Sequence, residues 1–464
     1  MKPRASLTEG PIPRTLLLFS LPVLFGNVLQ TLNGSVNSIW VGGYLGEAAL
    51  TATSNANLLM FLLAGVAFGV SMATSILVGQ HVGAKEIADA RRITGSSATF
   101  FMLLSLSTAL LGFAFTPQLL AWMHTPADAL PYARDYLRII FVGLPFSFGF
   151  FFVMAALRGA GDSRTPFIFM LLSVLLDIAL NPLLIFGLGP FPKMGIAGSA
   201  TATLIAQMVS LGAMFWYLYR RRHFLCIHRG EMHLLRIDWS IVRVLVTKGL
   251  PMGLQMLVAS SSMLVMLTFV NHHGSQVTAA FAAAMQLWAY IQMPALALSA
   301  SVSSMAAQNV GAGRWDRVSR IAITGVNFNF LMSGTLIALV YALNRHALGL
   351  FLPPGAEALD IAAHMNALIV WSFVLFGVTM VLFGVVRATG ATLPPLLLLF
   401  VSLWLVRIPL AKLLEQRFGI DGLWWSFPIA SIVSAMLAVG YYRYGAWRTA
   451  RMDAPRAAPA PESA

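Results

Sequence analysis

The sequence is short of charged residues. Only 10% of its 464 residues are Asp, Glu, Lys or Arg, whereas soluble globular proteins carry about a quarter. Hydrophobic residues make up 58% of the chain. Apolar runs of about 18 residues or more recur along it, and such runs read as membrane-spanning helices. The composition therefore excludes an ordinary soluble domain and indicates a polytopic membrane protein.

Motifs for metal or nucleotide chemistry are also missing. The one cysteine, Cys226, excludes an internal disulfide. The chain has no GxxxxGK[S/T] phosphate loop, no HExxH and no CxxC. Its nine histidines form no cluster with metal-ligand spacing, and most of them fall in predicted loops or in the linker. We therefore expect no cofactor, no metal site, no ATP hydrolysis and no enzymatic activity.

The apolar runs predict an all-α protein with twelve transmembrane helices. These lie near 15–41, 49–78, 93–115, 134–157, 166–186, 196–219, 249–271, 279–306, 321–343, 361–386, 394–415 and 421–442. Most of the 30 Lys and Arg residues then fall on the side that holds both termini. The positive-inside rule places that side in the cytoplasm. We expect a multi-pass protein of the inner (plasma) membrane. This spread also accounts for the net charge of +13 without nucleic-acid binding.

One phrase occurs twice, as "GQHVGAKEIADARR" (79–92) and "AQNVGAGRWDRVSR" (307–320). "SLPVLFG" (20–26) and "GLPMGLQ" (249–255) form a second matched pair, and "LRGAGDSRTP" and "VRATGATLPP" a third. The chain is therefore predicted to contain two homologous six-helix lobes in a parallel repeat, with a pseudo-twofold axis along the membrane normal. The expected parts are a cytoplasmic N-terminal segment (1–14), the N-terminal lobe (15–219), a basic cytoplasmic linker (220–248), the C-terminal lobe (249–442) and a disordered tail (443–464).

Two such lobes suit alternating access, and a gradient-driven carrier needs an ionisable group inside the membrane. Asp177 lies in the middle of the fifth predicted helix, where a carboxylate costs about 2.5–3.5 kcal/mol to insert. Asn181 lies one turn further along the same helix face. Arg407, in the eleventh helix, is a candidate partner of Asp177 and a candidate gate.

Polar side chains elsewhere complete the predicted sites. For ion coupling we expect Asp177, Asn181, Asn37, Ser199 and Thr203. For substrate binding we expect Asn27, Gln30, Asn55, Gln255, Gln286, Met256, Met285 and Trp288, since amides with methionine and aromatic residues suit varied cationic ligands. The alternative for the polar stripes is hydrogen bonding between helices, and for the methionine and aromatic residues it is packing against lipid.

The chain resembles the multidrug and toxic compound extrusion (MATE) transporters along nearly its whole length. The resemblance rests on "LPVLFGNVLQTLNGSVNSIWVGGYLGEAALTA", the two copies of the doubled phrase, "LRGAGDSRTP", "NPLLIFG" and "VRATG". It implies antiport, in which cationic amphipathic compounds leave while protons or Na⁺ enter. It also implies small-molecule drugs and membrane lipids as partners, and a monomer.

The chain departs from the family pattern at its ion sites. Asn37 stands where many members have Asp, and "DIALNP" reverses an Asn-x-x-x-Asp-Pro pattern of one branch. Ala259 and Phe376 stand where another branch has the Glu and Asp of a sodium site. Because Na⁺ prefers several oxygen ligands with compensating charge, protons are favoured over sodium.

Two other functions stay open at this point. A lipid or lipid-linked oligosaccharide flippase of the same superfamily has the same repeat, but it would want several arginines in its cleft for pyrophosphate. A membrane-embedded transferase would want clustered acids or histidines near one face, and the sequence shows none.

Overall fold

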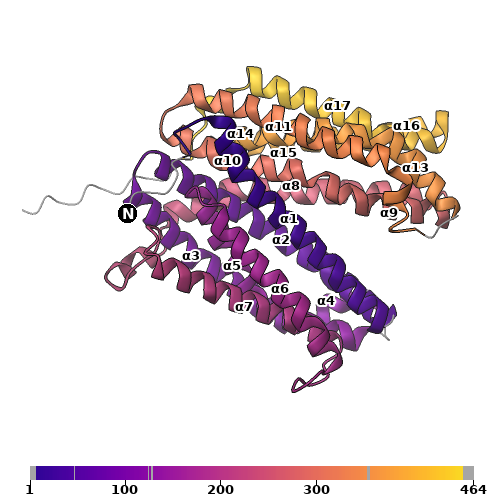
Figure 1. Cartoon of the computed structure of the whole chain (residues 1–464), viewed down its shortest axis with the longest axis horizontal. Coiled ribbons are helices and arrows are strands. Elements are labelled where there is room, and N and C mark those ends of the chain that lie inside the picture. Colours follow the sequence, from indigo (N-terminus) through magenta and orange to yellow (C-terminus); the bar gives the residue numbers. More distant parts are fainter. Residues whose placement is uncertain (1–6, 46, 124, 127–128, 353–355, 453–464) are drawn as a thin grey trace, which may run out of the picture. The chain divides into compact units, whose positions relative to one another are not determined.

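The computed structural model describes residues 7–45, 47–123, 125–126, 129–352 and 356–452, with the backbone alone for 38–39, 41–45, 47–58 and 229. Helices dominate the described part (Figure 1). The first half contains α1 (Ile12–Leu45), α2 (Glu47–Gly83), α3 (Ile87–Ala114), α4 (Thr116–Trp122), α5 (Leu130–Gly159), α6 (Arg164–Phe186) and α7 (Ile196–Arg220). A short helix, η1 (Arg229–Leu235), follows. The second half contains α8 (Trp239–Asn271), α9 (Ser275–Ile291), α10 (Met293–Gly311), α11 (Trp315–Ala342), α12 (Asn344–Leu348), α13 (Glu357–Ile369), η2 (Val370–Ser372), α14 (Phe373–Ala388), α15 (Leu393–Phe400), the π-helical η3 (Val401–Arg407), α16 (Ile408–Phe418), α17 (Ile420–Tyr444) and η4 (Ala446–Thr449).

The described residues contain 12 helical stretches that are long and apolar enough to cross a membrane, which confirms the all-α class and the predicted number of spans. Three stretches combine neighbouring helices, namely 275–311, 357–388 and 393–418. The first of these is interrupted between α9 and α10, where Pro294 stands in the first turn of α10. Proline has no N–H to continue the hydrogen-bond ladder, so the helix restarts there.

The described chain divides into two compact units. Unit 1 contains 25–250, and unit 2 contains 7–24 together with 251–452. Corresponding helices make the main contacts inside each unit: α2 packs on α5 and α6 on α7 in unit 1, while α10 packs on α14 and α16 on α17 in unit 2. The internal repeat is thus visible in the packing as well as in the sequence.

Unit 2 includes the residues before and at the start of α1, whereas the predicted N-terminal lobe began at residue 15. The second copy of the doubled phrase holds this segment by hydrogen bonds. The backbone N–H of Leu7 donates to Gln308 Oε1 at 3.1 Å, and Asn309 Nδ2 donates to the Leu7 carbonyl at 3.1 Å. Arg314 Nη1 donates to the Thr8 carbonyl at 2.7 Å. Side chains of this loop therefore satisfy backbone groups of the N-terminal segment and fix it to unit 2.

The linker between the repeats also packs against a helix. Arg91 of α3 forms an ion pair with Glu231 and donates to the carbonyl of Cys226 at 2.6 Å. Thr99 Oγ1 donates to the carbonyl of Leu235 at 2.7 Å. Side chains of α3 thus satisfy backbone groups of the linker, and the segment is part of unit 1.

The prediction of a disordered tail from residue 443 is wrong for its first ten residues. Helix α17 continues to Tyr444, and η4 follows it. Trp447 is fully buried, stacks on Tyr442, and accepts a hydrogen bond at its carbonyl from Thr389 Oγ1 at 2.8 Å. Burial of a large aromatic ring offsets the entropy lost when this segment becomes ordered. The prediction of disorder was based on the Pro- and Ala-rich composition of the residues that follow this segment. Residues 453–464 lie outside the described residues.

Candidate functional site

Asp177 is positioned by α6, whose two ends have clear local causes. At its start, Asp162 Oδ1 accepts hydrogen bonds from the backbone N–H groups of Arg164 and Thr165, both at 3.0 Å. A carboxylate in this position satisfies backbone N–H groups of the first helical turn, which have no partner within the helix, and it complements the helix dipole. At its end, Gly187 adopts a left-handed conformation with φ of +71°, which glycine tolerates without strain. The 23-residue span between them places Asp177 near its middle.

Four side-chain donors surround the Asp177 carboxylate, which is 1% exposed. Oδ2 accepts from Asn33 Nδ2 at 2.6 Å and from Asn37 Nδ2 at 3.1 Å, both on α1. Oδ1 accepts from Asn181 Nδ2 at 3.1 Å on the same helix and from Thr203 Oγ1 at 3.0 Å on α7. Burial penalises a charged carboxylate and these donors stabilise it. We find no ion pair with Lys, Arg or His for Asp177 within the described residues.

The cluster therefore brings together Asp177, Asn181, Asn37 and Thr203 from the predicted ion-coupling set. Ser199 is buried one turn before Thr203, and its carbonyl accepts from Thr203 Oγ1 at 3.3 Å. Sequence reasoning missed Asn33, which makes the shortest of the four hydrogen bonds. Its position four residues before Asn37 repeats the spacing of Asp177 and Asn181, and that spacing was the available signal.

Two amide oxygens near Asp177 have no hydrogen-bond partner although they are buried, namely Asn33 Oδ1 and Asn181 Oδ1. By contrast, Asn37 Oδ1 accepts from Asn181 Nδ2 at 2.9 Å. A buried acceptor without a donor is costly, and such groups are rare in native proteins. The site therefore holds unused acceptors beside its only carboxylate.

The residues predicted for substrate binding in the first half do not join this cluster. Asn27 is half-buried and Gln30 is exposed, and neither makes a hydrogen bond to Asp177. The side chain of Asn55 lies outside the described residues. Substrate roles for these three residues stay predictions.

The residues predicted for substrate binding in the second half lie in different surroundings. Gln255 is buried, and its Oε1 accepts from Arg387 Nη1 at 3.1 Å. Trp288 is buried in an aromatic cluster, and its Nε1 donates to Asn366 Oδ1 at 2.8 Å. Met256 and Met285 are half-buried, and Gln286 is exposed. Their substrate roles remain untested.

Arg407 lies in unit 2, at the end of the π-helical segment η3. Its Nη2 donates to Ser262 Oγ at 2.7 Å, and its guanidinium lies 5.0 Å from the ring centre of Phe427. Asp177 belongs to unit 1, so the predicted pairing of the two charges and the gating role stay predictions.

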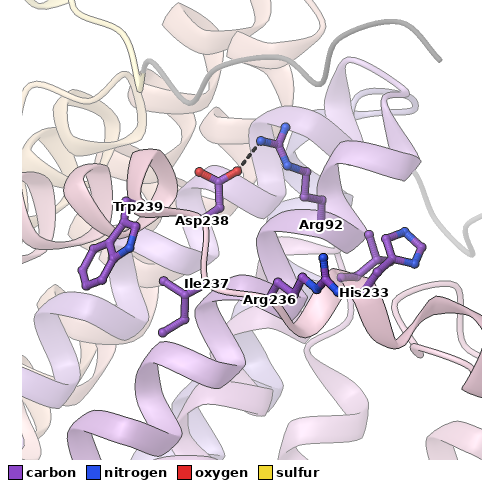
Figure 2. A pocket seen from close by; sticks show the side chains of 7 residues that line it. Arg92, His233, Arg236, Ile237, Asp238 and Trp239 are labelled. Carbon is purple, nitrogen blue, oxygen red and sulfur yellow. Dashed lines mark hydrogen bonds and ion pairs between the residues drawn. The ribbon is translucent and has the colours of Figure 1, made fainter. Parts of the chain in front are cut away.

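A pocket of about 330 Å³ opens where the linker meets α3 (Figure 2). Figure 2 shows Arg92 reaching Asp238, which forms an ion pair with it. The pocket is lined by Arg92, His233, Leu234, Arg236, Ile237, Asp238 and Trp239, and by none of the residues predicted for ion coupling or substrate binding.

Ion pairs set the titration of the two linker acids. The hydrogen bonds that Arg91 donates to Glu231, helped by the backbone N–H of His228, lower the pKa of Glu231 to about 2. Partial burial acts to raise the pKa of Asp238, but hydrogen bonds from Ser240 and Arg92 outweigh it and the net shift is downward. Both acids are therefore charged at neutral pH and hold the linker on α3.

The chain thus combines a buried carboxylate among polar side chains, a bundle of apolar spans and an internal repeat. This combination is typical of integral membrane transporters. The family model described as MatE matches residues 22–183 and again 251–413, one copy in each half. The chain therefore belongs to the MatE family, and it is a transporter and not an enzyme.

Relatives agree with this assignment. The chain is 36% identical over 433 residues to "Probable multidrug resistance protein YoeA" of Bacillus subtilis, covering 93% of each chain. It is 27% identical to the "FAD transporter" of Shewanella oneidensis, covering 93% of this chain and 95% of the relative. Among solved structures, an outward-facing multidrug resistance MATE family transporter matches with a TM-score of 0.88 at 20% identity, covering 94% and 96% of the two chains. These matches support a multidrug efflux transporter and confirm the fold.

Proposed function

We propose that the chain is a secondary antiporter that exports cationic amphipathic compounds while protons enter, and that Asp177 carries the proton. The observation that supports this most directly is the position of Asp177, which is a buried carboxylate in mid-span with two donors on each oxygen. Placing an ionisable residue inside the membrane costs free energy, so a residue in such a position is a candidate for function.

Protonation would reverse part of this hydrogen-bonding pattern. The ionised carboxylate only accepts, and α1, α6 and α7 each supply donors to it. A protonated carboxyl group must donate one hydrogen bond, so one of the four donors has to withdraw. If the amide of Asn33 or Asn181 turns over, its unpaired oxygen becomes the acceptor that the new O–H needs. Proton uptake would thus change how α1 and α7 are held against α6.

In the proposed cycle, Asp177 takes a proton when the transporter faces outward, which weakens the hold on a bound cation and releases it. Facing inward, Asp177 loses the proton to the cytoplasm and its negative charge favours the next cation. The two homologous units act as the lobes of alternating access. We further propose a monomer in the inner membrane with both termini in the cytoplasm and with lipid around its apolar spans.

Sodium is the second candidate for the coupling ion. Na⁺ is a hard cation that prefers several oxygen ligands. The two unpaired amide oxygens, together with the Asp177 carboxylate and Thr203 Oγ1, are the groups such an ion would use. The same geometry therefore supports both ions, and the choice is made by experiment.

The test is ethidium efflux from bacteria that lack their own drug pumps, at matched expression. Wild type is compared with Asp177→Asn in sodium-free buffer, with and without a protonophore. Asp421→Asn is the matched control, because it makes the same change at the end of another span, where the side chain of Asp421 is 47% exposed and pairs with His364.

Protonophore-sensitive efflux by wild type and Asp421→Asn, with none by Asp177→Asn, is the expected result. Efflux that requires added sodium would identify Na⁺, and not the proton, as the coupling ion. Efflux by Asp177→Asn at the wild-type rate and with the same pH dependence would overturn the proposed role of Asp177. Absence of efflux by wild type would reject this cargo and turn attention to the flippase alternative.

A further inference from the structure

Unit 2 buries an arginine in mid-membrane. The span 393–418 is 26 residues long, and Arg407 lies at least eleven residues from either end. At 1.5 Å of rise per residue, that is about 16 Å of helix or more on each side. A permanent cation at this depth is costly and marks a functional position more often than a structural one.

The guanidinium is only partly satisfied. The side chain is 8% exposed, and its Nη2 donates to Ser262 Oγ. Its Nε is buried without a hydrogen-bond partner. A guanidinium carries five N–H groups, and leaving buried donors unpaired is expensive. The ring of Phe427 stabilises the charge but accepts no conventional hydrogen bond from Nε.

The acids of unit 2 do not neutralise this charge. Among the described residues of unit 2, the acids in ion pairs have other partners: Asp360 pairs with Arg345, Asp421 with His364 and Glu415 with His273. No ion pair of Arg407 is found in the part of the chain that the structure describes. The charge is thus held in place and left without a counter-ion inside its own unit.

The backbone around Arg407 is unusual in the same place. Residues 401–407 form a π-helix, and Ser262 Oγ donates to the carbonyl of Leu403 at 3.0 Å while accepting from Arg407. Turns of π-helix are rare and are frequently found at functional sites. Ser262 therefore links the widened backbone to the guanidinium and fixes its direction.

From these observations we infer that Arg407 is an anion-binding position of unit 2, which takes the carboxylate of an amphipathic zwitterionic cargo. The planar fork of a guanidinium matches a carboxylate through two parallel hydrogen bonds, and Nε is one of the donors of such a pair. A lipid phosphate is the poorer fit, because phosphates lie outside a hydrocarbon core about 30 Å thick. The inference rests on the proposed transport of amphipathic compounds and adds a class of cargo to it.

Two dyes that differ only in the carboxylate test the inference. Rhodamine 110 carries a free carboxylate beside its cationic ring system, and rhodamine 123 is its methyl ester. Binding of each dye to the purified full-length protein in detergent is measured by fluorescence anisotropy. The variants are Arg407→Gln, Arg407→Lys and Ser262→Ala, and the matched control is Lys412→Gln, which removes an exposed charge from the same span.

We expect Arg407→Gln to weaken rhodamine 110 binding about tenfold or more and to change rhodamine 123 binding less than twofold. Arg407→Lys should fall between, because lysine keeps the charge and loses the fork. Ser262→Ala should weaken rhodamine 110 binding selectively but less, and Lys412→Gln should leave both dyes unchanged. Retained rhodamine 123 binding shows that a variant is folded.

Equal weakening of both dyes by Arg407→Gln, or no weakening of either, would overturn the inference while leaving the proposed function in place. Failure of the wild-type protein to bind either dye would overturn the proposed cargo class and the inference together.

Discussion

The substitution Gly95→Ala should release the linker from α3. Gly95 is buried on the face of α3 that carries the linker. A Cβ at this position would overlap the backbone carbonyl of Leu234 and would lie 2.9 Å from Ile227 Cδ1. A backbone oxygen cannot rotate away as a side chain can, so the linker has to shift or detach.

The expected size follows from the cost of overpacking. An added methyl group in a closely packed site costs about 1–3 kcal/mol. Because a membrane-spanning segment has to keep its backbone hydrogen bonds internal, we expect α3 to stay helical when the linker undocks. The cost then falls on the docking equilibrium. A change of about 1.4 kcal/mol is a tenfold change in an equilibrium constant, so the open population should rise between about fivefold and about 150-fold.

Cys226 reports this opening. It is the only cysteine of the chain, lies in the linker and is 8% exposed. Burial raises the pKa of its thiol, and the thiolate is the form that reacts with maleimide. Undocking therefore exposes the sulfur and favours the reactive form. The measurement is the rate of maleimide labelling of the native protein at constant pH.

Gly212→Ala is the matched control for this experiment. Gly212 lies on α7 in the same unit, and a Cβ there would meet no atom within 4 Å. Labelling of Gly95→Ala at the wild-type rate would refute the close packing of linker and helix. Equal acceleration by Gly212→Ala would show that the effect belongs to glycine replacement in general.

Two further predictions concern polar contacts described above, namely the ion pair of Glu231 and the hydrogen bonds of Asn309. Because the folded pKa of Glu231 is about 2, against an ordinary value of 4.5, its ion pair stabilises the fold above about pH 4.5 and is lost as the pH falls toward 2. The difference in thermal midpoint between wild type and Glu231→Gln should therefore shrink over that range, and a constant difference would contradict the pairing with Arg91. Asn309→Ala leaves the Leu7 carbonyl and Arg317 Nε without their partner and should lower the free energy of unfolding by about 1–3 kcal/mol. Denaturation of the purified protein measures this loss, and an unchanged midpoint would mean that water replaces the amide at no cost.

Sequence reasoning found much of the Asp177 cluster because its members share helix faces. Asp177 and Asn181 are one turn apart, and so are Asn33 and Asn37, of which only Asn37 was singled out. What periodicity cannot give is the rotation of α1 against α6, which selects Asn33 and Asn37 as partners and leaves Gln30 exposed. Whether these residues couple an ion to transport is a matter for the efflux assay.

The linker and the tail show what sequence composition does not predict, namely the docking of a polar segment onto the rest of the protein. The sequence marked 220–248 only as a basic linker and predicted a disordered tail from residue 443. In the structure, Arg91 and Thr99 hold the linker on α3, and Trp447 is buried near the end of the described chain. Docking of this kind depends on a surface formed by residues far away in sequence. Composition gives the average hydrophobicity of a segment. It does not tell whether another part of the folded protein offers a surface that the segment can pack against.

The sequence by itself determined the features that depend on neighbouring residues: twelve apolar spans, the internal repeat and an acid, Asp177, in the middle of a span. These follow from local hydrophobicity and from pattern, because a span must bury about 20 consecutive residues in lipid. Only the tertiary structure decided which side chains bond Asp177, that Arg407 rests on Ser262 and Phe427, and that the linker is docked. The contacts of Asp177 with Asn33, of Arg407 with Ser262 and of Arg91 with the linker join residues more than a hundred positions apart. All of these contacts form only when helix packing fixes the rotation and depth of each helix.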